Sequence, residues 1–128
     1  MIVLDASAAI EWLLQTPRGL RVGQRISGAS SLHAPHLLDV EVAQVLRRYV
    51  AVHGLPISRA EEALQDLMDV RIRRYPHIPF LRRIWALRNN LTSYDALYIA
   101  LAEALAATLV TCDAKLAAAP CGAQVEVI

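Results

Sequence analysis

Short apolar runs along the chain predict the strands of a parallel sheet. Residues 1–4 are apolar without alternation, which is typical of strands that are buried on both faces, and a second buried strand is expected at residues 109–112. Residues 70–75 alternate apolar and basic side chains, which predicts an edge or partly exposed strand. Further strands are expected at residues 32–34 and 125–128.

Apolar residues at helical spacing separate these strands. Ser7 is the expected N-cap of the first helix, and Ser58 with Glu61 fits a capping box. Thr92 or Ser93 caps the last long helix, which is apolar nearly all round and should be central. The helices are expected at residues 8–14, 18–29, 36–53, 58–69, from 79 onward, and from the cap at 92 or 93 to 107.

Strand and helix alternate along the whole chain. This order predicts an α/β fold, with one domain (residues 1–128) and a central mostly parallel β-sheet flanked by helices on both faces. A length of 128 residues suits one domain. Hydrophobic residues make up 55% of the chain, which indicates a well-filled core, a subunit interface, or both.

The sequence predicts neither a membrane span nor a secretory signal. The most apolar stretch, residues 96–110, contains Glu103 and is shorter than the roughly 18 clean residues of a span. The first residues lack the basic charge of a signal peptide and reach Asp5 at once. Two cysteines, Cys112 and Cys121, make no disulfide framework. We therefore expect a cytoplasmic protein.

Four acidic residues lie where strand changes to helix, or on the helices that follow. They are Asp5, Glu41, Asp95 and Asp113. The carboxyl ends of parallel strands form the edge where α/β sheets hold ligands. Carboxylates gathered there repel one another by about 4 kcal/mol per close pair at an effective dielectric of roughly 20, unless a cation or proton intervenes. The pattern suggests a divalent metal site.

Helix capping explains three of these acids without a metal. Asp5 can accept hydrogen bonds from the free amides of the following helix, and Asp95 fits a capping box with Thr92. Asp113 can cap the turn at residues 114–119. From these residues alone, caps and metal ligands remain open alternatives.

Glu41 competes with Asp39 for the remaining place. Both flank the apolar stripe of the helix near Leu38 and Val42, so periodicity does not choose between them. The histidines offer no ligand-like spacing that would favour zinc.

Basic residues alternate with the acids, although the formal net charge is only +1. No acid lies between Glu11 and Asp39 or between Asp69 and Asp95, and both stretches contain arginines. A phosphate backbone could lie along them. Ordinary solvated helix faces explain the same pattern.

Four motifs carry a resemblance to a known family. They are IVLDASAA at 2–9, PHLLDVEVAQVL at 35–46, LTSYDALYIALA at 91–102 and LVTCDAKL at 109–116. In this order and spacing the chain resembles PIN-domain ribonucleases, and among them the VapC-type toxins of bacterial toxin–antitoxin pairs. The resemblance covers essentially the whole chain, and the Tyr-Asp-Ala block with the later Thr-x-Asp is its most specific part.

The resemblance implies a function and a set of site residues. Asp5, Glu41, Asp95 and Asp113 match the family's acidic quartet for Mg²⁺ or Mn²⁺, with Glu41 chosen over Asp39. Ser7 and Thr111 match polar positions that support the site. Gln44 stands where relatives often have Asn, which leaves any contact from that position open.

The implied reaction is metal-dependent endonucleolytic cleavage of structured RNA. Mg²⁺ prefers oxygen ligands and is often held by one or two direct carboxylates. We expect Asp5 and Asp95 to bind the ion directly, and Glu41 and Asp113 to bind directly or through water. Arg82 and Arg83 are the expected RNA-backbone contacts.

The resemblance also implies partners. They are an RNA substrate, a cognate antitoxin that covers the site, and a second copy in a homodimer, either alone or within a larger toxin–antitoxin assembly. Tyr49 and Trp85 are candidate interface residues, although core packing explains them as well.

Three alternatives stay open at this point. The first is a PIN-domain nuclease in RNA maturation, and the second is a non-catalytic interaction module. The third is a receiver-like phosphoacceptor, against which Lys115 lies only two residues after Asp113 and no adjacent acid pair follows the first strand.

Overall fold

A five-stranded, fully parallel sheet forms the centre of the molecule. The computed structural model describes all residues 1–128. The strands are β1 (Ile2–Leu4), β2 (Leu32–Pro35), β3 (Ile72–Tyr75), β4 (Thr108–Thr111) and β5 (Gln124–Val127), in the order β3-β2-β1-β4-β5. The predicted α/β fold is confirmed, and β3 is an edge strand as its alternating pattern predicted.

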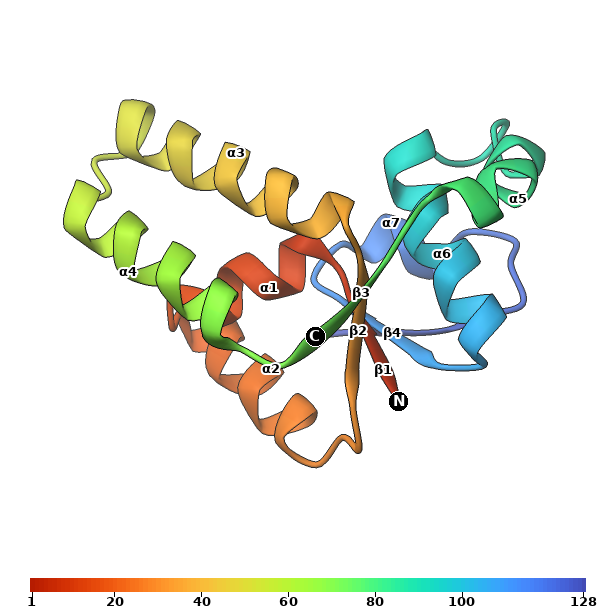
Figure 1. Cartoon of the computed structure of the whole chain (residues 1–128), viewed down its shortest axis with the longest axis horizontal. Coiled ribbons are helices and arrows are strands. Elements are labelled where there is room, and N and C mark those ends of the chain that lie inside the picture. The colour runs from red at the N-terminus through yellow and green to blue at the C-terminus, as the bar shows by residue number, and fades with distance from the viewer.

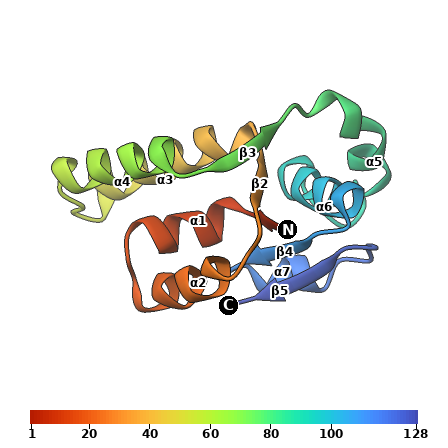
Figure 2. The same cartoon turned by 60° about the horizontal axis from the view of Figure 1, so that its bottom comes forward.

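Helices cover both faces of this sheet (Figure 1). They are α1 (Ala6–Leu13), α2 (Pro17–Ser27), α3 (Leu37–Val52), α4 (Ile57–Asp69), α5 (Leu81–Ala86), α6 (Ser93–Leu105) and the short α7 (Ala114–Ala117), with a 3₁₀ turn at Ile78–Phe80. Helices α1 to α4 lie on one side and α5 and α6 on the other, and α3 and α4 form a hairpin that extends beyond the sheet (Figures 1 and 2).

Helix α6 is the central helix that its apolar sequence predicted. Residues 96–102 are all buried, and the helix packs across β1, β2 and β4. Thr92 is its N-cap, with the hydroxyl accepting a hydrogen bond from the amide of Asp95 at 3.2 Å. Neither α6 nor any other helix is both long enough and apolar enough to cross a membrane.

Two predicted N-caps were wrong. Asp5, not Ser7, caps α1, because the helix begins at Ala6, directly after the strand, and the Asp5 side chain accepts from the amide of Ala8. Helix α4 begins at Ile57 after Pro56, so Ser58 lies inside its first turn and does not cap it. In each case the helix starts earlier than the position of the hydroxyl residue suggested.

Close packing of α1 on α2 fixes the layer next to β1. A side chain at Gly19 would place its Cβ 1.8 Å from the carbonyl oxygen of Glu11, so only glycine permits this approach. The contact packs α2 directly against α1, the helix that follows Asp5.

Candidate active site

The four acids meet at the carboxyl-terminal edge of the sheet. Asp5 follows β1 and Asp113 follows β4, whereas Asp95 lies in the first turn of α6 and Glu41 lies on α3. All four line one cavity of about 300 Å³. Parallel strands and their following helices thus bring together residues that are far apart in the sequence.

Asp5 is the most deeply buried of the four, with 4% of its surface exposed. Its Oδ1 accepts hydrogen bonds from Ser7 Oγ at 2.8 Å and from the Ala8 amide at 2.9 Å, and its Oδ2 accepts one from Thr111 Oγ1. A carboxylate has about four acceptor positions, so roughly one remains for a cation or a water. Asp5 therefore serves as a helix cap and still faces the cavity.

Ser7 and Thr111 join the ends of β1 and β4 behind Asp5. Their hydroxyl oxygens are 3.1 Å apart, and the Cys112 amide donates to Ser7 Oγ at 2.9 Å. The Asp113 amide donates to Thr111 Oγ1, also at 2.9 Å. The two hydroxyls connect Asp5 and the start of the Asp113 turn in one hydrogen-bond network, and their role in supporting a metal site stays a prediction.

The structure shows which of the two acids, Glu41 or Asp39, lies at the cavity, a choice that helical periodicity left open. Glu41 faces the cavity, and its Oε1 accepts a hydrogen bond from the Tyr98 hydroxyl at 2.9 Å. Asp39 instead forms a bidentate ion pair with Arg74 on β3, with Nε to Oδ2 at 2.7 Å and Nη2 to Oδ1 at 2.9 Å. Asp39 therefore has a structural partner outside the cavity.

The acids of the cavity repel one another, and none of them is paired with a base, although the charge of Lys115 partly offsets the repulsion at Asp95. Burial raises the pKa of Asp5, Glu41 and Asp95 above their ordinary values. The charge of Asp95 raises the pKa of Asp5 and of Glu41 further, and the charge of Asp113 does the same for Asp95. None of the four carboxylates forms an ion pair.

The donor set suits a hard, partly hydrated cation. The cavity offers carboxylate and hydroxyl oxygens, which Mg²⁺ and Mn²⁺ prefer. No three Asp, Glu, His or Cys side chains converge closely enough to enclose an ion by themselves. Mg²⁺ does not require such a cage, because it keeps several waters and binds through one or two carboxylates.

The arginines at the cavity are not those expected from the sequence. Arg18 of α2 and Arg48 of α3 line it, and both are exposed and free of ion pairs. Arg82 and Arg83 lie on α5 and do not line it, and Arg83 is paired with Glu103 at 2.7 and 2.9 Å. The RNA-contact role of Arg82 and Arg83 stays a prediction.

A helical spacing could have identified Arg48 from the sequence. Glu41, Val45 and Arg48 are separated by four and three residues, so they share one face of α3, and all line the cavity. Tyr98 likewise follows Asp95 by three residues on α6. Gln44 is exposed and does not line the cavity.

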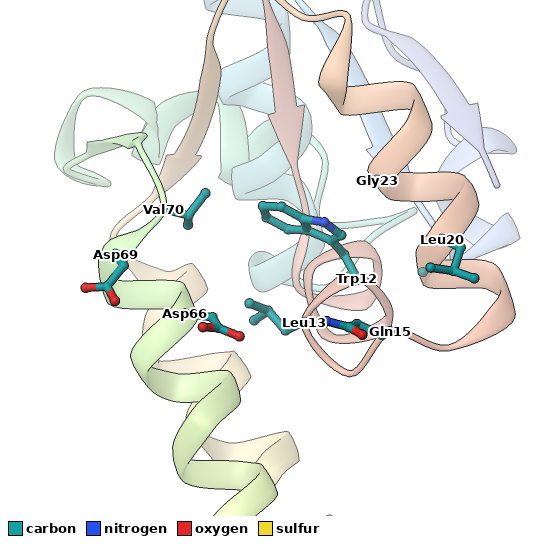
Figure 3. A pocket seen from close by; sticks show the side chains of 9 residues that line it. Trp12, Leu13, Gln15, Leu20, Gly23, Asp66, Asp69 and Val70 are labelled. Carbon is teal, nitrogen blue, oxygen red and sulfur yellow. The ribbon is translucent and has the colours of Figure 1, made fainter.

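A second hollow, of about 720 Å³, shares no residue with the acidic cavity. We call it the Trp12 groove, since the indole of Trp12 lies between α2 and the end of α4 (Figure 3). The exposed Asp66 and Asp69 of α4 line its far wall. A Cβ at Gly23 would be 3.3 Å from the indole, so this glycine leaves the ring room against α2.

Comparisons with known proteins agree with the fold and the motifs. The family model of the PIN domain matches residues 2–120. A VapC ribonuclease of Mycobacterium bovis is 43% identical over 116 residues, which cover 91% of this chain and 88% of that protein. Ribonuclease VapC12 of Mycobacterium tuberculosis is 41% identical over 117 residues, which cover 91% and 90%.

Solved structures of PIN toxins share the architecture. VapC20 of Mycobacterium tuberculosis, described as a toxin that cleaves the sarcin-ricin loop, superposes with a TM-score of 0.72 at 14% identity, over 94% of this chain and 96% of that one. VapBC2 of Rickettsia felis, solved with a DNA fragment from its promoter, gives 0.71 at 15% identity, over 99% and 98%. At these identities the likeness concerns the fold alone. From the family match and the identity to curated relatives, the chain belongs to the PIN-domain family and, within it, to the VapC ribonucleases.

Proposed function

We propose that this protein is a Mg²⁺- or Mn²⁺-dependent endoribonuclease and the toxin of a toxin–antitoxin pair. The observation that carries the proposal is the convergence of Asp5, Glu41, Asp95 and Asp113 on one cavity, where none of them forms an ion pair. Membership of the VapC ribonucleases supports the choice of RNA as substrate.

Each residue of the cavity has a role that its position suggests. Asp5 and Asp95 hold the cation directly, and Glu41 and Asp113 orient its waters or bind it directly. Ser7 and Thr111 keep Asp5 in place through the hydroxyl network. When bound, the divalent ion supplies an activated water and neutralises charge on the scissile phosphate.

Cleavage of structured RNA with and without chelator tests this function. The purified protein should cut RNA in Mg²⁺ or Mn²⁺, stop in EDTA, and resume when the cation is restored in excess. Cleavage that persists in EDTA would contradict the metal mechanism. A protein that cuts no RNA in either metal would contradict the nuclease assignment itself.

We expect Arg18 and Arg48 to bind the RNA backbone beside the scissile phosphate. Their guanidinium groups lie at the cavity without acidic partners, so they are available to phosphates. Because each arginine would neutralise one phosphate, Arg18→Gln or Arg48→Gln should lower the log–log salt slope of RNA affinity by about 0.7 to 0.9. The measurement uses an Asp95→Asn background, in which cleavage should be slow enough for binding to be measured.

Arg82→Gln is the matched comparison for this prediction. It removes one exposed arginine of α5 that does not line the cavity. The salt slope of RNA affinity could instead stay unchanged in Arg18→Gln and Arg48→Gln and fall in Arg82→Gln. That result would place the RNA backbone along α5, as the sequence suggested.

We propose that the antitoxin binds in the Trp12 groove and reaches the acidic cavity around α1. Ile10 and Glu11 line the cavity, and the next two residues, Trp12 and Leu13, line the groove. The acids Asp66 and Asp69 near the carboxyl end of α4, together with the indole, favour a segment that is both basic and apolar.

Co-expression with the protein encoded immediately upstream, which we expect to be a small DNA-binding protein, tests this partner. The pair should copurify and lose RNA cleavage, and Trp12→Ala should weaken the complex by tenfold or more, about 1.4 kcal/mol, as expected for a central tryptophan. A complex unaffected by Trp12→Ala would place the antitoxin elsewhere. If the protein cleaves RNA but no upstream partner binds or inhibits it, the RNA-maturation alternative would be favoured.

We propose a homodimer that forms through the surface around α5. Trp85 is 68% exposed, and Leu81 and Tyr94 are exposed beside it around a hollow of about 350 Å³. A protruding indole and an apolar hollow on one surface can engage each other across a two-fold axis. Tyr49 is half-buried against the core and lines the acidic cavity, so Trp85 is the better candidate.

Sedimentation of the wild type should give a dimer, and Trp85→Arg should give a monomer. Val52→Arg is the control, because Val52 is 70% exposed but lies near the far end of α3. Dissociation by both variants, or by neither, would contradict this interface.

A further inference from the structure

Tyr98 presents its only polar side-chain atom to the acidic cavity. The residue lies one turn after Asp95 on α6, and only 2% of its surface is exposed. Its ring belongs to the hydrophobic core, while its hydroxyl donates to Glu41 Oε1 at 2.9 Å. This is the one hydrogen bond between side chains of α3 and α6.

The direction of this hydrogen bond limits what Tyr98 can do. The phenol has a single proton, and it donates this proton in the hydrogen bond to Glu41. Tyr98 therefore holds a carboxylate of the cavity. Because Oε1 already accepts this hydrogen bond, the Oε2 atom of Glu41 is the freer oxygen for a cation or its waters.

We propose that Tyr98 is a positioning residue that holds Glu41 in its cation-binding orientation. The proposal rests on the proposed function, because it assigns Glu41 to the cation site. Glu41 comes from a helix on one side of the sheet and Tyr98 from a helix on the other, so the bond also fixes the cavity's width. Residues that orient a metal-binding group typically change metal affinity by tenfold or more when they are replaced.

The test compares Mn²⁺ affinity, measured by calorimetry on the whole chain, among four proteins. They are the wild type, Tyr98→Phe, Glu41→Gln and the double variant. Tyr98→Phe keeps the ring and its packing, and it should weaken Mn²⁺ binding by about tenfold. In the Glu41→Gln background the same change should have little further effect, because the carboxylate that Tyr98 positions is already gone.

Tyr75→Phe is the control for loss of a hydrogen-bonded tyrosine hydroxyl, at a residue that is partly buried. Tyr75 OH lies 2.8 Å from His33 Nδ1, and Tyr75 does not line the acidic cavity. This variant should lower the thermal midpoint in EDTA about as much as Tyr98→Phe does, while its Mn²⁺ affinity stays at the wild-type value. RNA cleavage by Tyr98→Phe should recover to near the wild-type rate when Mn²⁺ is saturating.

Three results separate the possible failures. If Tyr98→Phe binds Mn²⁺ as tightly as the wild type does, the positioning role is overturned, while the nuclease proposal stays intact. An equal loss of affinity in the wild-type and Glu41→Gln backgrounds would show that Tyr98 acts on the fold and not through Glu41. Failure of the wild type itself to bind Mn²⁺ would overturn the proposed function on which this inference rests.

Discussion

The substitution Asp95→Asn should lower RNA cleavage by about a thousandfold while the protein stays folded. The change removes a charge but keeps nearly the same shape. Direct cation contact is worth several kcal/mol in the transition state, and about 4 kcal/mol corresponds to this loss of rate. The measurement is the cleavage rate at saturating Mg²⁺, with circular dichroism to confirm the fold.

Asp95 gives a cleaner test than Asp5. Asp5 caps α1 and accepts three hydrogen bonds, so its replacement also costs about 1 kcal/mol or more of stability. Asp95 forms no ion pair and is not the N-cap of its helix, because Thr92 is the cap and accepts a hydrogen bond from the Asp95 amide.

Asp39→Asn is the matched control for this substitution. It makes the same chemical change two residues before Glu41, at an acid that pairs with Arg74 outside the cavity. It should leave cleavage close to the wild-type rate. Comparable activity in Asp95→Asn and the wild type would remove Asp95 from the site, and loss of activity in Asp39→Asn would reopen the choice between Asp39 and Glu41.

Divalent cations should raise the melting temperature of the protein by about 10 °C. A ligand that binds only the folded state adds about 2.7 kcal/mol at a hundredfold excess over Kd, which is roughly 10 °C for a domain of this size. The measurement is thermal unfolding in EDTA and in Mg²⁺ or Mn²⁺ at constant ionic strength. A shift that KCl reproduces at equal ionic strength would indicate screening and not a specific site.

The raised pKa values of the acids determine how the stability of the metal-free protein changes with pH. Asp5, Glu41 and Asp95 bind their protons more tightly in the folded protein than in the unfolded chain. Their contribution to metal-free stability is therefore fully present below the ordinary carboxyl pKa, and it is lost as the pH rises through the raised values. In EDTA at neutral pH, Asp95→Asn should melt higher than the wild type, and it should lose most of the cation-induced shift.

The sequence predicted the strands and helices well, because apolar runs and apolar stripes at helical spacing indicate directly which residues are buried. The parallel strands at residues 1–4 and 109–112 and the central helix α6 are confirmed. Capping was predicted less well, because Ser7 and Ser58 have the right chemistry but lie one or two residues inside their helices. Asp5 took the capping position because β1 passes directly into α1.

The candidate site depended more on the motifs than on physical patterns. Periodicity placed Asp39 and Glu41 beside the same apolar stripe, and only the three-dimensional position of Arg74 on β3 shows which acid has another partner. The pairing of Arg83 with Glu103 spans 20 residues between α5 and α6, a separation that no local pattern reveals. The spacing of Glu41 and Arg48 was visible in the sequence but gained meaning only when the cavity was known.

The most direct measurement is the anomalous diffraction of a crystal soaked in Mn²⁺. We expect a strong anomalous peak inside the acidic cavity, in contact with Asp5 and Asp95. The same peak should be absent from crystals of Asp95→Asn. A cavity that stays empty at a Mn²⁺ concentration that supports RNA cleavage would contradict the central claim that these four acids form the metal site.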